Sequence, residues 1–210
     1  MHIHMDEIID ELRKDRPIFC SEDDFKFEMA SLLRKKYPDI DILLEYTPEL
    51  NKKMHIDIMV ISPDGWIPIE LKYKTAEYSK KIGCVNYNLT DQSARDQGAY
   101  RYLHDIERTE TIKEKEPDLF QEGYAVMITN DRGYIEEPHK KDCYSAQFCI
   151  NEGVEKTGIM KWDDKAADGT KGDCEKPIEL QGTYRMHWKD YSRLDDSRNG
   201  KFYYIVNCIE

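Results

Sequence analysis

Residues 55–73 decide the fold, and they read HIDIMVISPDGWIPIELKY. The central Ser-Pro-Asp-Gly at 62–65 has the residue types of a tight turn, and the flanking segments are rich in Ile and Val, as strands are. We therefore predict a β-hairpin with strands at 55–61 and 66–73. If residues 62–65 form the turn, Ile61 pairs with Trp66, and Asp57 lies opposite Glu70.

The alternation of side chains along a strand assigns the two faces of this hairpin. Asp57, Glu70 and Lys72 share one face. The other face packs on the core and carries Ile56, Ile58, Val60, Ile67, Ile69 and Leu71. A two-residue turn at Asp64-Gly65 would keep this assignment, whereas a slip of one residue would break it.

Two opposed carboxylates in an apolar hairpin need compensation, because like charges directly across a strand pair are destabilising. A divalent cation bound through oxygen atoms provides it. The alternative is a solvated polar face with an ordinary Glu–Lys pair. A nearby helix favours the cation: Glu28 falls between Phe25 and Met29 on or beside the apolar stripe, and a buried acid needs a partner or a metal. Glu28 at the rim, reaching a basic side chain, is the alternative.

The order of the remaining elements indicates a mixed α/β protein. Ser21 is a suitable N-cap for a helix over 22–37, which Pro38 ends. A strand follows at 41–46, then the hairpin, an irregular stretch at 75–90, a helix at 91–110 and a buried strand at 124–129. Further short strands are expected at 146–150, 157–162, 183–188 and 202–207, and a polar exposed loop at 163–176.

A helical Glu28, then Asp57, then Glu70-Leu71-Lys72, in the order helix, three strands, helix, strand, resembles the PD-(D/E)XK nuclease superfamily. The resemblance covers residues 21–131 and departs where Asp57 follows Ile56 instead of Pro. It implies a restriction-endonuclease-like core, with a mixed central sheet flanked by helices and additional C-terminal strands. We expect one domain over 1–210, with the nuclease-like core at 21–131 and extra strands and the polar loop at 132–210.

The resemblance also implies a metal site and a reaction. Asp57 and Glu70 would hold Mg²⁺ or Mn²⁺ together with the backbone carbonyl of Leu71, and Glu28 would reach the metal directly or through water. Lys72 would orient or help deprotonate the attacking water and stabilise the transition state. A metal acting as Lewis acid and a positioned cation suit phosphodiester hydrolysis.

Candidate substrate-binding residues follow the hairpin. Gln92 and Tyr100 lie on one polar stripe of the 91–110 helix. Exonuclease-like branches of the superfamily carry a Gln and an aromatic residue on the equivalent helix, and Gln92 with Tyr100, or Gln97 with Tyr100, could play that part, although neither pair has the family's spacing. Lys74 could meet a phosphate beside the scissile bond. The alternative is an amphipathic helix held by ion pairs such as Asp105–Arg108. Glu45, at the end of the 41–46 strand, is a further carboxylate near Asp57.

Composition limits the class of protein. Among the 210 residues, 42 acidic and 31 basic side chains give a net charge of −11, which argues against coating nucleic acid through overall attraction. A locally basic groove is still compatible with this net charge. No apolar run reaches the ~18 residues of a membrane span. Six cysteines without a CxxC pair argue against a zinc site, and no glycine-rich phosphate loop occurs.

We therefore expect a cytoplasmic, metal-dependent hydrolase, a deoxyribonuclease of the PD-(D/E)XK type. Its expected partner is nucleic acid, DNA rather than RNA, with no membrane partner and with a homodimer as a candidate assembly. The alternative is a catalytically inactive nuclease-fold protein that binds or regulates. A third interpretation is an unrelated α/β protein in which Glu-x-Lys is a coincidence, and it predicts that Asp57 and Glu70 lie far apart or on different faces.

Overall fold

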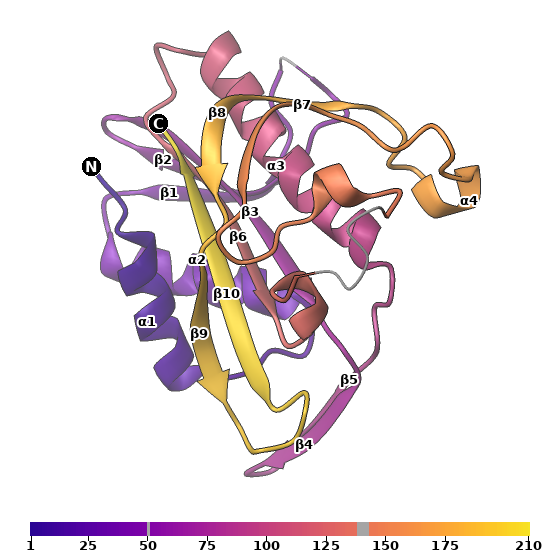
Figure 1. The fold of residues 1–210 in the computed structure, drawn as a ribbon. Helices are drawn as coiled ribbons and strands as arrows, with labels where there is room; N and C mark the ends of the chain where they lie inside the picture. The colour runs from indigo at the N-terminus through magenta and orange to yellow at the C-terminus, as the bar shows by residue number, and fades with distance from the viewer. Residues whose placement is uncertain (50, 138–142) are drawn as a thin grey trace.

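A computed structural model describes residues 1–49, 51–137 and 143–210. It shows an α/β protein built on a mixed six-stranded sheet, with strand order β1-β2-β3-β6-β10-β9 (Figure 1). The strands are β1 (Asp41–Tyr46), β2 (Ile56–Ser62), β3 (Gly65–Lys74), β6 (Gly123–Thr129), β10 (Lys201–Ile209) and β9 (Trp188–Arg193). Among the strands described, β3 and β6 alone pair in parallel, and the connection between them contains α3 (Arg95–Lys115).

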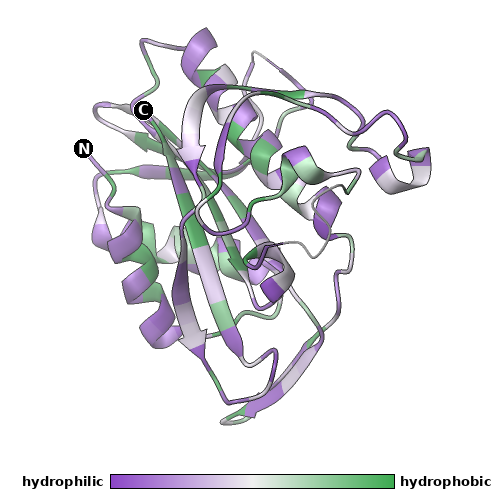
Figure 2. Ribbon diagram, in the orientation of Figure 1, coloured by the Kyte–Doolittle hydropathy of each residue, from purple (hydrophilic) through white to green (hydrophobic). Residues whose placement is uncertain are grey.

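Helices cover both faces of the sheet. Tyr124 and Val126 of β6 belong to the core that contains α1 (Met5–Asp15) and α2 (Glu22–Lys36), whereas Ala125 and Met127 belong to the core that contains α3. Since neighbouring strand residues point to opposite faces, α1 and α2 lie on one face and α3 on the other. Figure 2 shows hydrophobic residues along the central strands and on the side of α1 that faces them.

Helix α2 forms where the sequence predicts a helix. The Ser21 hydroxyl accepts a hydrogen bond from the Asp24 amide at 3.1 Å, which satisfies one free amide of the first turn. Phe25, Met29 and Leu33, four residues apart, are fully buried and hold the helix on the sheet. The helix thereby fixes which of its polar side chains reach the sheet.

The predicted hairpin register is confirmed, because Ile61 pairs with Trp66 and Ile58 with Ile69. Beyond Ile58 the regular pairing ends, and a side chain takes over: Oδ2 of Asp57 accepts the Leu71 amide at 2.8 Å. On the other side of β2, Glu45 lies between two regular β1–β2 pairs and has a φ of 51°. Both neighbours of β2 are thus irregular around Asp57.

The same irregularity changes the facing of one residue. Ile56 was expected beside Ile58 on the core face, but it packs in a separate cluster with Met54, Met59 and Ile112 of α3. Ile58 and Val60 belong to the core around α2, and Asp57 also contacts α2 through Lys26, so the regular alternation of β2 holds only from Ile58 onward.

Other expectations require correction. Residues 75–90, expected to be irregular, form a hairpin of β4 (Tyr78–Ile82) and β5 (Val85–Leu89). Helix α1 was not predicted, and helix α3 begins and ends later than the expected 91–110. The expected strand at 146–150 is a 3-10 turn over Ala146–Phe148. The expected strand at 183–188 divides between β8 (Ile178–Arg185) and β9.

The C-terminal residues do two different things. Strands β9 and β10 extend the central sheet beside β6, whereas β7 (Glu155–Met160) and β8 form a separate hairpin, and β8 packs on α3. The 163–176 loop is mostly exposed, but it contains the short α4 (Asp168–Lys171) and the buried Cys174, whose carbonyl accepts the Trp162 indole at 2.6 Å. No helix of the described residues is long and apolar enough to cross a membrane.

Candidate active site

Asp57 lies at the centre of the irregular pairing and is held by main chain and side chain together. Its side chain is 14% exposed, and Oδ1 forms an ion pair with Nζ of Lys26 at 2.9 Å. Lys26 extends from α2 and also contacts Glu45. Burial alone would raise the pKa of Asp57, but Lys72, the Leu71 amide and Lys26 offset it, and the pKa is lowered. Asp57 is therefore ionised at neutral pH.

Glu70 comes from the neighbouring strand β3 and is almost completely buried, with 1% of its side chain exposed. Its Oε2 accepts the Asp57 amide at 3.5 Å, and its Oε1 lies 2.9 Å from Nη2 of Arg108. Oε1 has ionic contact with Arg108 but no hydrogen bond. Burial, followed by the nearby charge of Asp105, raises the pKa of Glu70 well above its usual value.

Lys72 completes the Glu-x-Lys pattern two residues along β3. Its Nζ donates to the Leu71 carbonyl at 3.1 Å and lies 2.7 Å from Oδ2 of Asp105. Burial opposes the charge of Lys72, but Asp105 and further carboxylates more than compensate, so the pKa of Lys72 is raised. Lys72 is therefore a fixed cation at neutral pH, not a proton acceptor.

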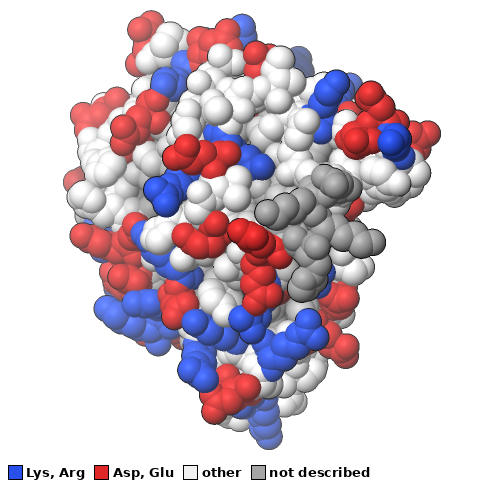
Figure 3. All heavy atoms as spheres, viewed as in Figure 1, with Lys and Arg blue, Asp and Glu red and all other residues white. Residues whose placement is uncertain are grey.

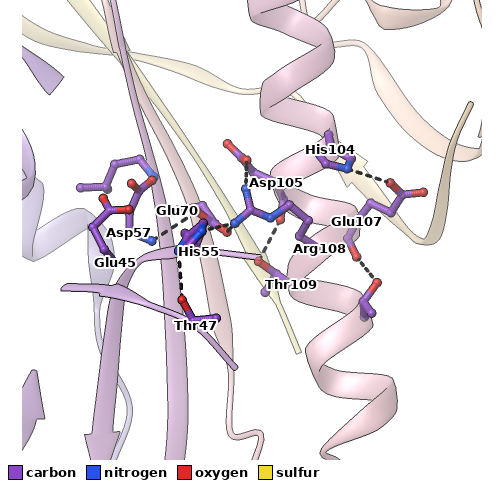
Figure 4. A network of polar contacts seen from close by, with 12 residues as sticks. Glu45, Thr47, His55, Asp57, Glu70, His104, Asp105, Glu107, Arg108 and Thr109 are labelled. Carbon is purple, nitrogen blue, oxygen red and sulfur yellow. Dashed lines mark hydrogen bonds and ion pairs between the residues drawn. The ribbon is translucent and has the colours of Figure 1, made fainter. Parts of the chain in front are cut away.

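Arg108 and Asp105 of α3 connect these groups (Figure 4). Besides Glu70, Arg108 contacts Oδ1 of Asp105 at 3.3 Å and donates to the His55 carbonyl. Asp105 has 3% of its side chain exposed and thus bridges Arg108 and Lys72 inside the protein. The sequence indicated the Asp105–Arg108 pair only as a helical ion pair, and nothing in its spacing showed that it faces Glu70.

The structure brings Asp57, Glu70, Leu71 and Lys72 together, but it places Glu28 elsewhere. Glu28 has 30% of its side chain exposed and pairs with Arg16. Helix α2 presents Glu22 instead: Oε2 of Glu22 accepts the Tyr73 amide at 2.7 Å, and its charge acts on Lys72. The first turn of α2 is acidic in the sequence, but nothing in its spacing shows that Glu22 reaches β3.

The expected substrate-binding residues do not form one surface. Gln92 is exposed and precedes α3. Tyr100 is buried in the core that contains α3, and its hydroxyl donates to the Lys176 carbonyl at 2.9 Å. Lys74 is half-buried at the end of β3, and burial lowers its pKa. Of these three residues, only Lys74 lies on β3, the strand that carries Glu70 and Lys72.

Basic side chains gather at the lower end of Figure 3, and two of the lysines of β4 and β10 are paired with acids. Lys80 of β4 pairs with Asp195, and Lys201 of β10 pairs with Asp190. Figure 3 shows the blue atoms gathered across this end of the molecule, with red atoms among them.

The chemistry of the donor groups, although not their present arrangement, fits a divalent cation. Within 1–49, 51–137 and 143–210, no group of three His, Cys, Asp or Glu is arranged to hold a metal ion. Asp57, Glu70 and the Leu71 carbonyl are nevertheless the oxygen donors that Mg²⁺ prefers, and Oε1 of Glu70 is a buried oxygen without a hydrogen bond. Each carboxylate contacts a protein cation, Lys26 or Arg108, that a metal would have to replace.

Comparisons with known proteins give no family for this chain. No protein-family model matches it, and neither the search of curated proteins nor that of solved structures finds a significant match.

Proposed function

We propose that the protein is a metal-dependent nuclease with a restriction-endonuclease-like core, which hydrolyses phosphodiester bonds of DNA in the cytoplasm. One observation carries this proposal: Asp57, Glu70 and Lys72 meet around the main chain of Leu71, with its amide on Asp57 and its carbonyl on Lys72. A carboxylate pair beside a fixed cation is suited to placing a water and a phosphate together.

The residues divide the work as follows. Asp57, Glu70 and the Leu71 carbonyl would hold Mg²⁺ or Mn²⁺, which when bound polarises the phosphate and lowers the pKa of a bound water. Lys72 stays protonated, so it orients the attacking water and stabilises the charge that develops on the phosphate oxygens. Asp105 holds the Lys72 ammonium group in place, and Glu22 holds the following amide of β3.

Cleavage of supercoiled and linear DNA with Mg²⁺ or Mn²⁺ tests this function, using wild type, Asp57→Asn and Lys72→Met. We expect both variants to lose activity by about 100-fold or more. Arg101→Met is the matched control, because it removes an exposed cation that pairs with Asp173. Wild-type rates in the Asp57 and Lys72 variants, or no cleavage of either DNA or RNA by wild type, would contradict the proposal.

A second candidate is a catalytically inactive protein of the same fold that binds a partner. It is favoured by the ion pairs Lys26–Asp57 and Arg108–Glu70, which already compensate the acids without a metal. This candidate predicts nucleic-acid binding that is unaffected by chelation, by Asp57→Asn and by Lys72→Met. Binding measured with EDTA in parallel with the cleavage assay separates the two functions.

A further inference from the structure

Arg108 occupies a position between the buried acids and an open cleft. Its side chain is 20% exposed and contacts Glu70, Asp105 and the His55 carbonyl. On the outer side, Arg108 lines a cleft of about 350 Å³ together with His55, His104 and Glu107. Figure 4 shows its guanidinium group reaching from α3 towards Glu70.

The contact with Glu70 resembles a substitute for a bound cation. Oε1 of Glu70 is buried, forms no hydrogen bond, and lies 2.9 Å from Nη2 of Arg108. A divalent ion held between Asp57 and Glu70 would lie on the same carboxylate as Arg108, and two cations so close in a buried site repel each other strongly. Arg108 and a metal would therefore compete for the charge of Glu70.

The cleft gives the guanidinium group a second place. Glu107, one residue before Arg108, also lines it, and its side chain is 26% exposed. A rotation of the Arg108 side chain into this cleft would exchange a contact with Glu70 for one with Glu107 or solvent, without moving α3.

We infer that Arg108 is a displaceable internal counter-ion that competes with a divalent cation, Mg²⁺ or Mn²⁺, for Glu70 and thereby lowers the metal affinity of the site. This inference rests on the proposed function for the identity of the cation. It adds a control on the occupancy of the site, since anything that draws Arg108 into the cleft, such as a phosphate group, would favour metal binding.

Calorimetric titration of the full chain with Mn²⁺ tests the inference. We expect Arg108→Met to bind Mn²⁺ about tenfold or more tightly than wild type, the scale of one charge-assisted contact. Arg101→Met is the matched control: it removes an arginine from the same helix and changes the net charge equally, and its affinity should equal that of wild type. Adding Asp57→Asn to Arg108→Met should abolish the tighter binding.

Arg108→Met leaves two buried acids without this cation, so its fold is checked by circular dichroism, and Mn²⁺ should raise its melting temperature more than that of wild type. If it does not fold, Arg108→Lys, which cannot make all three contacts, replaces it. Equal, weaker or absent Mn²⁺ binding by the folded variant overturns the inference. Metal-dependent cleavage by wild type would then leave the proposed function standing, whereas tighter binding without any cleavage would refute the nuclease alone.

Discussion

Asp105 is the residue on which the balance of charge in the cluster depends. It faces both Lys72 and Arg108, with contacts of 2.7 and 3.3 Å, from a position with 3% of its side chain exposed. A buried ion pair contributes little net stability when whole, but removing one partner leaves an uncompensated charge. The cluster should therefore be most sensitive to changes that remove one member only.

Asp105→Asn is predicted to lower the free energy of unfolding by about 3 kcal/mol. The amide keeps the shape of the side chain but no longer neutralises Lys72 and Arg108. Urea denaturation at pH 7 measures the change. Asp173→Asn is the control, because it removes an exposed partner, 76% accessible, of another α3 arginine, and should change stability by less than about 1 kcal/mol. Equal effects of the two substitutions would contradict this view of the cluster.

A second prediction for a single residue concerns Lys156, which lies apart from Asp57, Glu70 and Asp105. It is 8% exposed, and Nζ donates to the Gln147 carbonyl at 2.7 Å. Burial lowers its pKa from 10.5. The folded state therefore disfavours the proton, and the protein gains stability as the pH rises from the lowered pKa through 10.5.

Lys156→Met should consequently stabilise the protein at pH 7, by about 1 kcal/mol, since an apolar side chain replaces a buried charge. The advantage should shrink as the pH approaches 10.5, where the wild-type lysine has lost its proton in both states. Melting temperatures of the two proteins at pH 7 and pH 10 measure this. A difference that is independent of pH would show that packing, not charge, is responsible.

At the scale of elements, the sequence predicted the parts whose signals are local. The 62–65 turn and the Ser21 cap specify the β2–β3 hairpin and the start of α2, and the apolar spacing specifies the buried face of that helix. The β4–β5 hairpin was missed because half of its strand residues are Ser, Lys or Asn, and mainly Tyr78 and Leu89 pack on the core. The alternation of Val85, Tyr87 and Leu89 with two asparagines along β5 is a strand signal that was overlooked in this short segment.

The assignment of the helical acid failed for a different reason. Glu28 lies near the apolar stripe of α2, but Arg16, just after α1, pairs with it. Because α1 was not predicted, no sequence signal placed Arg16 beside α2. Glu22 reaches β3 because α2 starts there, and only the packed orientation of the helix shows this.

This assignment predicts different effects for two similar substitutions in α2. Glu22→Gln should lower the rate of metal-dependent DNA cleavage by about tenfold, the scale for residues that support metal ligands, because it removes the charge that acts on Lys72. Glu28→Gln should leave the rate within about twofold, on the same scale. Single-turnover rates at saturating Mn²⁺ compare them. The reverse order of effects would restore Glu28 to the site.

At the scale of the whole molecule, the net charge of −11 is distributed in two ways. Asp57, Glu70 and Asp105 are compensated internally by Lys26, Arg108 and Lys72. The excess of acid therefore lies outside this group of residues, and Figure 3 shows acidic and basic atoms on the visible face. A polyanionic substrate would meet overall repulsion at long range, and local attraction only at the site.

The last prediction follows from this distribution: DNA binding by the wild type should depend on a divalent ion and should be weak without it. Fluorescence anisotropy with a labelled duplex in EDTA and in Ca²⁺, chosen to limit cleavage, measures the affinity. We expect Ca²⁺ to increase it by about tenfold, and Asp57→Asn to remove this increase. In EDTA, the affinity should change little between 50 and 200 mM salt, because few phosphate contacts release counterions. A protein with six to ten phosphate contacts would instead lose about a thousandfold or more in affinity over the same range. Strong, salt-sensitive binding in EDTA would instead show a basic surface that acts without metal, and would favour the binding function over the nuclease.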